Sequence, residues 1–342
     1  MQELLELFVI RGKNSLTSIF TFLRFFLGSA GTWQQSFYSF GYVVLAFEAY
    51  VIHDWRTLTI ISILPTLIVL LVYKSIPESP RWLVSQGRIK EAEDILRKIK
   101  KENGYLDNEE ISLKLESKRA KGEGKMLQRG IMDLFTHKSV CVITVVMMLL
   151  WCVVSMVYYG LALNAKNLGG NLYINFVLGS LIELPSFLAT QILLSKFGRR
   201  QSLFVFFLGG SFSCLLCMFL QLQGGYYVAA ISTTALGGRF CISAAYAVLY
   251  LYSAELFPTV VRNAGMGISS FSARIGGMVA PFIVLSGDHH VSLPMFIFAC
   301  TALFAGIAGL TLRETQGQRM PETFEDLEEG HSRKLIKTNG EH

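Results

Sequence analysis

The sequence predicts an all-α polytopic membrane protein. Of its 342 residues, 52% are hydrophobic and only 16% are charged, whereas ordinary soluble domains carry roughly 25% charged residues. Uncharged or nearly uncharged runs recur along the chain, and many are close to the ~20 residues with which a helix crosses a bilayer. A soluble fold would lack the polar side chains needed to cover this apolar content.

Nine apolar segments are expected to span the membrane, from their length and their lack of charge. They are residues 15–33, 35–52, 57–76, 138–160, 172–195, 201–222, 226–252, 263–286 and 291–312. A long polar insert, 78–137, separates the third span from the fourth. The tail from Arg313 onward is polar and is expected to be disordered.

The first part of the insert has apolar residues at helical spacing, with charged residues between them. They are Ile89, Ala92, Ile95, Leu96 and Ile99. This pattern predicts an amphipathic helix that lies on an apolar partner, either the bilayer surface or the ends of other helices.

The distribution of the remaining polar residues excludes several classes of protein. The formal charge is +6, and Lys and Arg gather in 78–138 and in connections such as 195–202. That is the positive-inside pattern of cytoplasmic loops, and it argues against a nucleic-acid partner. All six cysteines lie in or beside apolar runs, which favours buried thiols over disulfides or a metal site. No Gly-Lys-Ser/Thr loop for ATP occurs, so primary pumping is not supported. An enzyme is the least expected class, and no cofactor is expected.

Charged motifs with helix-ending prolines or glycines follow three of the apolar segments. They are "PESPRWL" at 77–83, "FGRR" at 197–200 and "ELFPTVVR" at 255–262. Proline cannot continue the hydrogen-bond ladder of a helix, so the first and third motifs mark the ends of spans. Further distinctive runs are "VYYGLALNAKNLGGNLYINF" at 157–176, "LIELPSF" at 181–187, "ARIGGMVAPF" at 273–282 and "PETFEDL" at 321–327.

In this order, these motifs resemble the organic cation, anion and carnitine transporters, solute carrier family 22 of the major facilitator superfamily. The resemblance implies a major facilitator fold with a complete C-terminal six-helix half and about three helices of the N-terminal half. It divides the chain into a partial N-terminal half, a cytoplasmic amphipathic-helical loop, a C-terminal half and a cytoplasmic tail. The corresponding ranges are 1–77, 78–137, 138–312 and 313–342. The family's first three helices have no counterpart, so the chain reads as N-terminally truncated.

Five ionisable residues lie within the predicted spans, where each costs ~2.5–3.5 kcal/mol on insertion scales unless it is paired or hydrated. They are Arg24, Glu48, Glu183, Arg239 and Arg274. By resemblance Arg274 lines the central cavity, where it would bind a carboxylate through bidentate hydrogen bonds. The alternative is a structural ion pair with Glu183 or another acid. Arg239 and Glu183 are likewise candidates for substrate contact or for an interhelical pair.

Aromatic residues near these charges are weaker candidates. Tyr158, Tyr159 and Phe271 could supply stacking or cation–π contacts to an organic ion. Packing alone explains them equally well in a chain that has 25 Phe and 13 Tyr.

The charged motifs also supply a candidate cytoplasmic gate. The gate residues are Glu78, Arg81, Gly198, Arg199, Arg200, Glu255 and Arg262. By resemblance they form salt bridges that close the inner face while the outer face is open, since a few such pairs can bias a two-state equilibrium. Anchoring of loops to lipid headgroups is the alternative.

Two functions follow from the resemblance. The first is transport of a small organic ion across the lipid bilayer by alternating access, with an anion or a carnitine-like zwitterion expected and an organic cation as a variant. The second is a truncated, non-transporting form that is retained in the endoplasmic reticulum, or that associates with the full-length transporter and regulates it. Family resemblance places the first at the plasma membrane.

Overall fold

The computed structural model is helical throughout the residues it describes, apart from short turns and connections. These residues are 37–72, 77–78, 80, 83, 88–102, 132–165, 172–223, 228–318 and 320–321, and no strand occurs among them. The predicted all-α class is confirmed. Contacts divide the chain into two compact units, each described by itself below.

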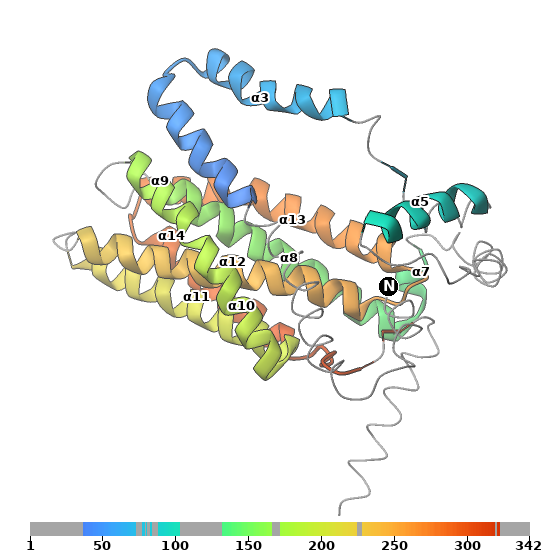
Figure 1. Ribbon diagram of the computed structural model, residues 1–342. Helices are drawn as coiled ribbons and strands as arrows, with labels where there is room; N and C mark the ends of the chain where they lie inside the picture. Colours follow the sequence, from blue (N-terminus) through green and yellow to red (C-terminus); the bar gives the residue numbers. More distant parts are fainter. Residues whose placement is uncertain are drawn as a thin grey trace, which may run out of the picture. The chain divides into compact units, whose positions relative to one another are not determined.

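The first unit comprises Met1–Tyr50, Val142–Phe257 and Met266–Met320. The helices that lie wholly or mainly in it are Phe37–Val51, α8 (Lys138–Leu163), α9 (Leu172–Leu181), α10 (Glu183–Phe197), α11 (Arg199–Leu222), α12 (Val228–Leu256), α13 (Arg262–Leu285), the short 3-10 helix η3 (Ser286–Asp288) and α14 (Leu293–Gly309). Within this unit α12 packs against both α10 and α11, and α11 packs also against α14 (Figure 1).

Among the residues that the structure describes, five helical segments are long and apolar enough to cross a membrane. They are Lys138–Leu163, Leu172–Phe197, Arg199–Leu222, Val228–Leu256 and Arg262–Asp288, and they match five predicted spans. The spans predicted at 35–52 and 291–312 form shorter apolar helices, Phe37–Val51 and Leu293–Gly309. The span predicted at 15–33 lies outside the described residues, and with it Arg24. The protein is a multi-pass membrane protein.

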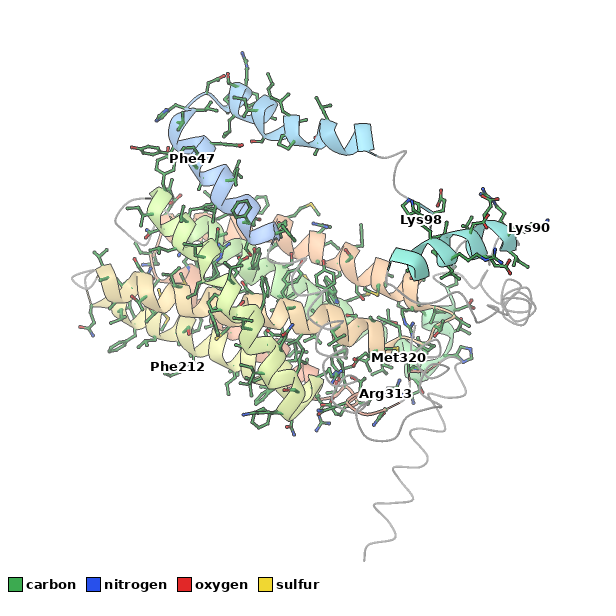
Figure 2. The ribbon with its side chains drawn as sticks, viewed as in Figure 1. Phe47, Lys90, Lys98, Phe212, Arg313 and Met320 are labelled. Atoms are coloured by element: carbon green, nitrogen blue, oxygen red, sulfur yellow. The ribbon has the colours of Figure 1, made fainter. Side chains whose placement is uncertain are left out.

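The outer surface of α11 is apolar, as expected of a helix that faces lipid. Val205, Leu208, Phe212, Leu215 and Phe219 recur at three- or four-residue intervals and are 37% to 66% exposed. Figure 2 shows the Phe212 side chain standing away from the helix. The opposite face of α11, which includes Phe207, is buried. A soluble protein rarely exposes a continuous apolar stripe of this size, so hydrocarbon is its natural solvent.

A break at Ile182 divides the predicted span 172–195 into α9 and α10. Pro185 follows three residues later and has no N–H, so the carbonyl four residues before it loses its helical partner. The break leaves Glu183 in the first turn of α10, where it is 1% exposed. The local sequence therefore fixes a carboxylate inside the membrane-spanning bundle.

The second unit comprises Val51–Cys141, Pro258–Gly265 and Pro321–His342. Its helices are α3 (Trp55–Val72), α5 (Ile89–Glu102) and α7 (Asp133–Thr136). The carboxylate of Asp54 caps α3 by accepting hydrogen bonds from the Thr57 backbone N–H at 3.0 Å and the Thr57 hydroxyl at 2.7 Å. Such a cap satisfies donors that a helix start leaves unpaired.

The predicted amphipathic helix is α5. Ala92 packs on Leu83, with Ile89, Ile95 and Leu96 partly buried around them. Lys90 and Lys98 extend from the helix into solvent (Figure 2). Ile99 was expected on the apolar face but is 42% exposed, so the buried face of α5 ends at Leu96.

Candidate functional site

A buried ion pair lies within the first unit. Arg239, on α12, places its Nη2 atom 2.8 Å and its Nε atom 3.1 Å from Oε1 of Glu183 on α10. Both residues are at most 5% exposed. Two charges in a low-dielectric interior need such pairing, because the loss of hydration costs several kcal/mol for each ion. Of the alternatives left open by the sequence, Arg239 is the arginine that Glu183 compensates.

Two hydroxyl groups complete the surroundings of the Glu183 carboxylate. Tyr158, on α8, donates to Oε1 at 2.8 Å, and Ser39, on the helix Phe37–Val51, donates to Oε2 at 2.6 Å. The guanidinium of Arg239 also lies 5.1 Å above the centre of the Tyr158 ring. Tyr158 is 7% exposed, so in this conformation its hydroxyl serves the ion pair and not the open surface.

Arg274 lies in a different environment, on the exposed face of α13. The ion pairs among the described residues join Arg88 to Glu91, Arg199 to Glu255 and Arg239 to Glu183, and Arg274 takes part in none of them. Its side chain interacts with the Tyr159 hydroxyl, which also interacts with Tyr38. A cation on an exposed face with hydroxyl groups beside it is suited to binding an anion.

Aromatic side chains from α8 and α12 form a connected group next to these charges. Trp151 meets Tyr246 and Tyr250 edge-to-face with ring centres 5.6 Å and 4.5 Å apart, and Tyr158 meets Tyr246 at 5.7 Å. Phe271, on α13, is 63% exposed and is no member of this group. Trp151, Tyr246 and Tyr38 were not predicted as site residues, because helical spacing of aromatics also describes ordinary packing.

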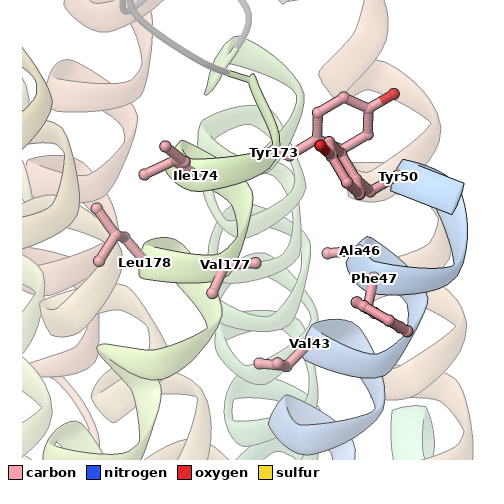
Figure 3. Close-up of a pocket in the computed structure, with 8 residues that line it drawn as sticks. All are labelled: Val43, Ala46, Phe47, Tyr50, Tyr173, Ile174, Val177 and Leu178. Atoms are coloured by element: carbon pink, nitrogen blue, oxygen red, sulfur yellow. The ribbon is translucent and has the colours of Figure 1, made fainter.

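The described residues of this unit line two cavities of different size, among others. The larger, of about 350 Å³, is lined by the helix Phe37–Val51 and α9, through Val43, Ala46, Phe47, Tyr50, Tyr173, Ile174, Val177 and Leu178 (Figure 3). No charged side chain lines it, and none of the predicted site residues does. The smaller, of about 20 Å³, adjoins Arg239, Gly179 and Asn175. It has room for about one water molecule.

Several of the predicted gate residues meet where α10 passes into α11. Arg199 forms an ion pair with Glu255 through Nη2 and Oε1, 2.9 Å apart. The hydroxyl of Thr315 donates to Oε2 of Glu255 at 2.5 Å. This pair lies within the C-terminal half, so it joins α11 to the end of α12 and to the residues that follow α14.

Glu314, which was not predicted, caps the start of α11. Its carboxylate accepts the backbone N–H groups of Arg199 at 2.8 Å and Arg200 at 3.0 Å. Burial alone would raise the pKa of the Glu314 carboxyl, but four backbone N–H donors together lower it below its usual value. The expectation that the tail is disordered from Arg313 is therefore wrong for 313–318, which have defined contacts. The positive start of a helix attracts carboxylates, but no local sequence signal points to Glu314, because it lies 115 residues away from Arg199.

Gly198 provides the backbone geometry at this junction. Its φ is +84°, a region that side chains disfavour, and a Cβ added there would lie 2.7 Å from Cδ of Glu314. Glycine alone allows both the turn and the close approach of the capping carboxylate.

Of the other predicted gate residues, the structure describes Glu78 and Arg262. Glu78 is exposed, and Arg81 lies outside the described residues. Arg262 donates to the Thr259 hydroxyl at 3.1 Å. The gate role of the whole set therefore stays a prediction.

Comparison with known proteins places these features in a family. The profile described as "Sugar (and other) transporter" matches residues 24–327. Organic cation/carnitine transporter 2 of Homo sapiens is 37% identical over 292 residues, which are 85% of this chain and 52% of that protein. Organic cation transporter protein of Drosophila melanogaster is 38% identical over 305 residues, 87% of this chain and 55% of that protein. Solute carrier family 22 member 15-like of Xenopus laevis is 34% identical over 327 residues, which are 94% of this chain and 66% of that protein.

Solved structures show the same fold. The major facilitator proton:xylose symporter XylE bound to 6-bromo-6-deoxy-D-glucose has a TM-score of 0.62 at 21% identity, with 88% of this chain and 66% of that chain covered. XylE of E. coli in its inward open conformation has a TM-score of 0.60 at 19% identity, with 87% and 64% covered.

The chain spans about half the length of its first curated relatives. Their names confirm the resemblance to solute carrier family 22, and the family consists of transporters and not of enzymes. The profile match covers most of the chain. The protein thus belongs to the sugar (and other) transporter family of the major facilitator superfamily, and the relatives that it matches include members of solute carrier family 22.

Proposed function

We propose that the protein transports a small organic ion that carries a carboxylate, an anion or a carnitine-like zwitterion, by alternating access. The observation that carries this proposal is the contrast between two arginines. Arg239 is neutralised by Glu183 at 2.8 Å, whereas Arg274 is exposed and takes part in no ion pair among the described residues. Arg274 is thus the intramembrane charge with capacity to bind a substrate anion.

The groups around Arg274 support an organic substrate. Tyr159 lies beside the guanidinium. Tyr246 and Tyr250 on α12 are partly exposed, and they pack on the buried rings of Tyr158 and Trp151. A carboxylate would accept two parallel hydrogen bonds from Arg274, while aromatic rings would contact a quaternary ammonium or an apolar group. The relatives named as organic cation/carnitine transporters agree with this chemistry. Glu183, Arg239, Tyr158 and Phe271 remain candidates for the substrate path.

Alternating access requires that the two halves move relative to each other. In the proposal, the gate residues Glu78, Arg81, Gly198, Arg199, Arg200, Glu255 and Arg262 stabilise the closed inner face. The Arg199–Glu255 pair and the Glu314 cap stiffen the C-terminal half so that it moves as one body.

Uptake assays test the proposal. Cells that express this chain are given carnitine, a simple quaternary ammonium and an aromatic carboxylate, with surface labelling in parallel. Arg274→Glu is expected to abolish uptake of the carboxylates, because a like charge repels them. Arg97→Glu, at an exposed position of α5, is the matched control. Unchanged carboxylate uptake by Arg274→Glu would contradict the proposed role.

A second function is favoured by one observation, the coverage of only about half of each first relative. In this case the chain does not transport, and it is retained in the endoplasmic reticulum or associates with a full-length transporter and regulates it. Uptake and surface labelling of this chain, compared with a version extended upstream by three further helices, decide between the two. Uptake by the extended version alone would favour the second function, whereas uptake at the plasma membrane by this chain would exclude it.

A further inference from the structure

Among the described residues that precede the long polar insert, Ser39 donates a hydrogen bond to the buried ion pair. Ser39 lies on the helix Phe37–Val51 and donates to Oε2 of Glu183 at 2.6 Å. The other partners of Glu183, Tyr158 and Arg239, come from α8 and α12. Ser39 is 1% exposed, so no solvent water can take the place of Glu183 as the partner of its hydroxyl.

Two contacts of this helix with α9 are between aromatic rings and depend less on exact geometry. Tyr42 meets Phe176, and Tyr50 meets Tyr173, both edge-to-face with ring centres 5.6 Å apart. Tyr50 and Tyr173 also line the apolar cavity of about 350 Å³ (Figure 3). Aromatic contacts beside a cavity tolerate sliding, whereas a hydrogen bond to a buried carboxylate depends steeply on distance and angle.

Breaking this hydrogen bond leaves the carboxylate compensated. Glu183 would keep the Arg239 guanidinium and the Tyr158 hydroxyl, both bound to Oε1. Loss of the Arg239 guanidinium would leave the Glu183 carboxylate as an uncompensated buried charge, but loss of one neutral donor does not. The contact is therefore strong enough to select a conformation and weak enough to be broken reversibly.

We propose that Ser39 is a positioning residue of the transport cycle. Its hydrogen bond to Glu183 holds the helix Phe37–Val51 against the C-terminal half in the present conformation, and it breaks when the halves separate. This inference rests on the proposed function, because alternating access is what requires the halves to separate.

Photo-cross-linking of the full chain in lipid nanodiscs tests the inference. Tyr50 is replaced by p-azidophenylalanine, whose ring takes the place of a ring 5.6 Å from that of Tyr173. The yield of cross-links to α9 then measures how often the helix is docked. The yield is compared in Ser39→Ala, Ser39→Thr and Ser186→Ala backgrounds. Ser186 is an apt control because it is buried and donates to the Glu183 carbonyl within its own helix, at 2.6 Å.

In Ser39→Ala the ratio of docked to undocked molecules is expected to fall about tenfold, which corresponds to about 1.4 kcal/mol and to the low end for a hydrogen bond to a charged group. Ser39→Thr, which keeps the hydroxyl, is expected to restore the yield, and Ser186→Ala to leave it unchanged. An unchanged yield in Ser39→Ala, or an equal fall in Ser186→Ala, would overturn the inference.

Ser39→Cys keeps the test decisive should Ser39→Ala fail to fold. A thiol is moderately larger than the hydroxyl and is a weak donor, so the yield is expected to fall here too, and a wild-type yield would overturn the inference. Cross-linking does not depend on uptake. If the chain shows the expected cross-linking pattern but takes up no substrate, only the transport proposal is contradicted. Ser39 then still links the helix Phe37–Val51 to the C-terminal half.

Discussion

The guanidinium of Arg239 and the carboxylate of Glu183 form a buried ion pair with Nη2 and Oε1 2.8 Å apart. The two side chains reach each other from α12 and α10, which pack together in the C-terminal half. Gly179 makes room for the pair, since a Cβ there would lie 3.3 Å from Cδ of Arg239. Small residues beside a buried arginine allow helices to approach while the charge finds its partner.

Removing one member of this pair should destabilise the protein strongly. Arg239→Met leaves the Glu183 carboxylate buried without a counter-charge, and the loss is expected to be about 3–5 kcal/mol. The double variant Arg239→Met with Glu183→Gln removes both charges and should recover more than half of that loss. Thermal unfolding in detergent is measured for wild type, the two single variants and the double variant. This double-mutant cycle gives the coupling free energy between Arg239 and Glu183. Additive losses in the double variant would contradict a direct pair.

The crossing of α8 and α13 depends on Gly276. A Cβ at this position would lie 2.0 Å from the carbonyl oxygen of Cys152, and neither backbone can move without separating the helices. Gly276→Ala is therefore expected to cost about 3 kcal/mol or more in the free energy of unfolding.

Gly267, on the same helix, is the matched control for that substitution. Nothing lies within 4 Å of a Cβ added there, so Gly267→Ala should be neutral or should stabilise α13 by up to about 1 kcal/mol. The yield of folded protein and its thermal midpoint compare the two variants. Equal behaviour of both would show that the crossing is not tight at Gly276.

Much of the fold could be predicted from the sequence, because an uncharged run of membrane length has few alternatives to a helix. The five long helices follow from that rule. The break at Ile182 was not predicted. Pro185 indicates a missing hydrogen bond, but proline can also bend a helix without ending it.

The site was less predictable than the fold. Glu183, Arg239 and Arg274 stood out because ionisable residues are rare in a membrane, but sequence alone could not say which arginine Glu183 pairs with. Ser39 and Glu314 escaped notice, since a serine in an apolar run and a glutamate after the last helix are common. Their roles come from contacts across 144 and 115 residues of sequence, which no local pattern encodes.

A comparison of Gly198 with Gly317 separates the cost of a strained backbone from the cost of a steric clash with an added Cβ. Both have positive φ, +84° and +72°, but a Cβ at Gly317 meets nothing within 4 Å, whereas at Gly198 it meets the Glu314 carboxylate. Gly317→Ala is expected to cost about 1 kcal/mol, the cost of a left-handed alanine. Gly198→Ala should cost more, because it also displaces the cap of α11. Thermal unfolding of the two variants checks this, and an equal loss would mean that Glu314 is free to move aside.

The Glu314 cap should make the stability of the protein depend on pH in the acid range. The pKa of this carboxyl in the folded protein is lower than its ordinary value of 4.5, since the backbone N–H donors that bind the carboxylate outweigh the opposing effect of burial. Its contribution is therefore fully present above about pH 4.5 and is lost as the pH falls through the lowered pKa. Glu314→Gln, which carries no charge, should be less stable than wild type at neutral pH, and the difference should shrink toward about pH 4 and below.

The matched control for this prediction is Glu91→Gln on α5. The pKa of Glu91 is also lowered, through its hydrogen bonds with Arg88, but both side chains are about half exposed. An exposed pair contributes little to stability, so the difference between wild type and Glu91→Gln should be small at every pH. Thermal midpoints measured from neutral pH to about pH 4 test both variants. A gap for Glu314→Gln that stays constant over this range would show that the carboxylate charge does not stabilise the start of α11.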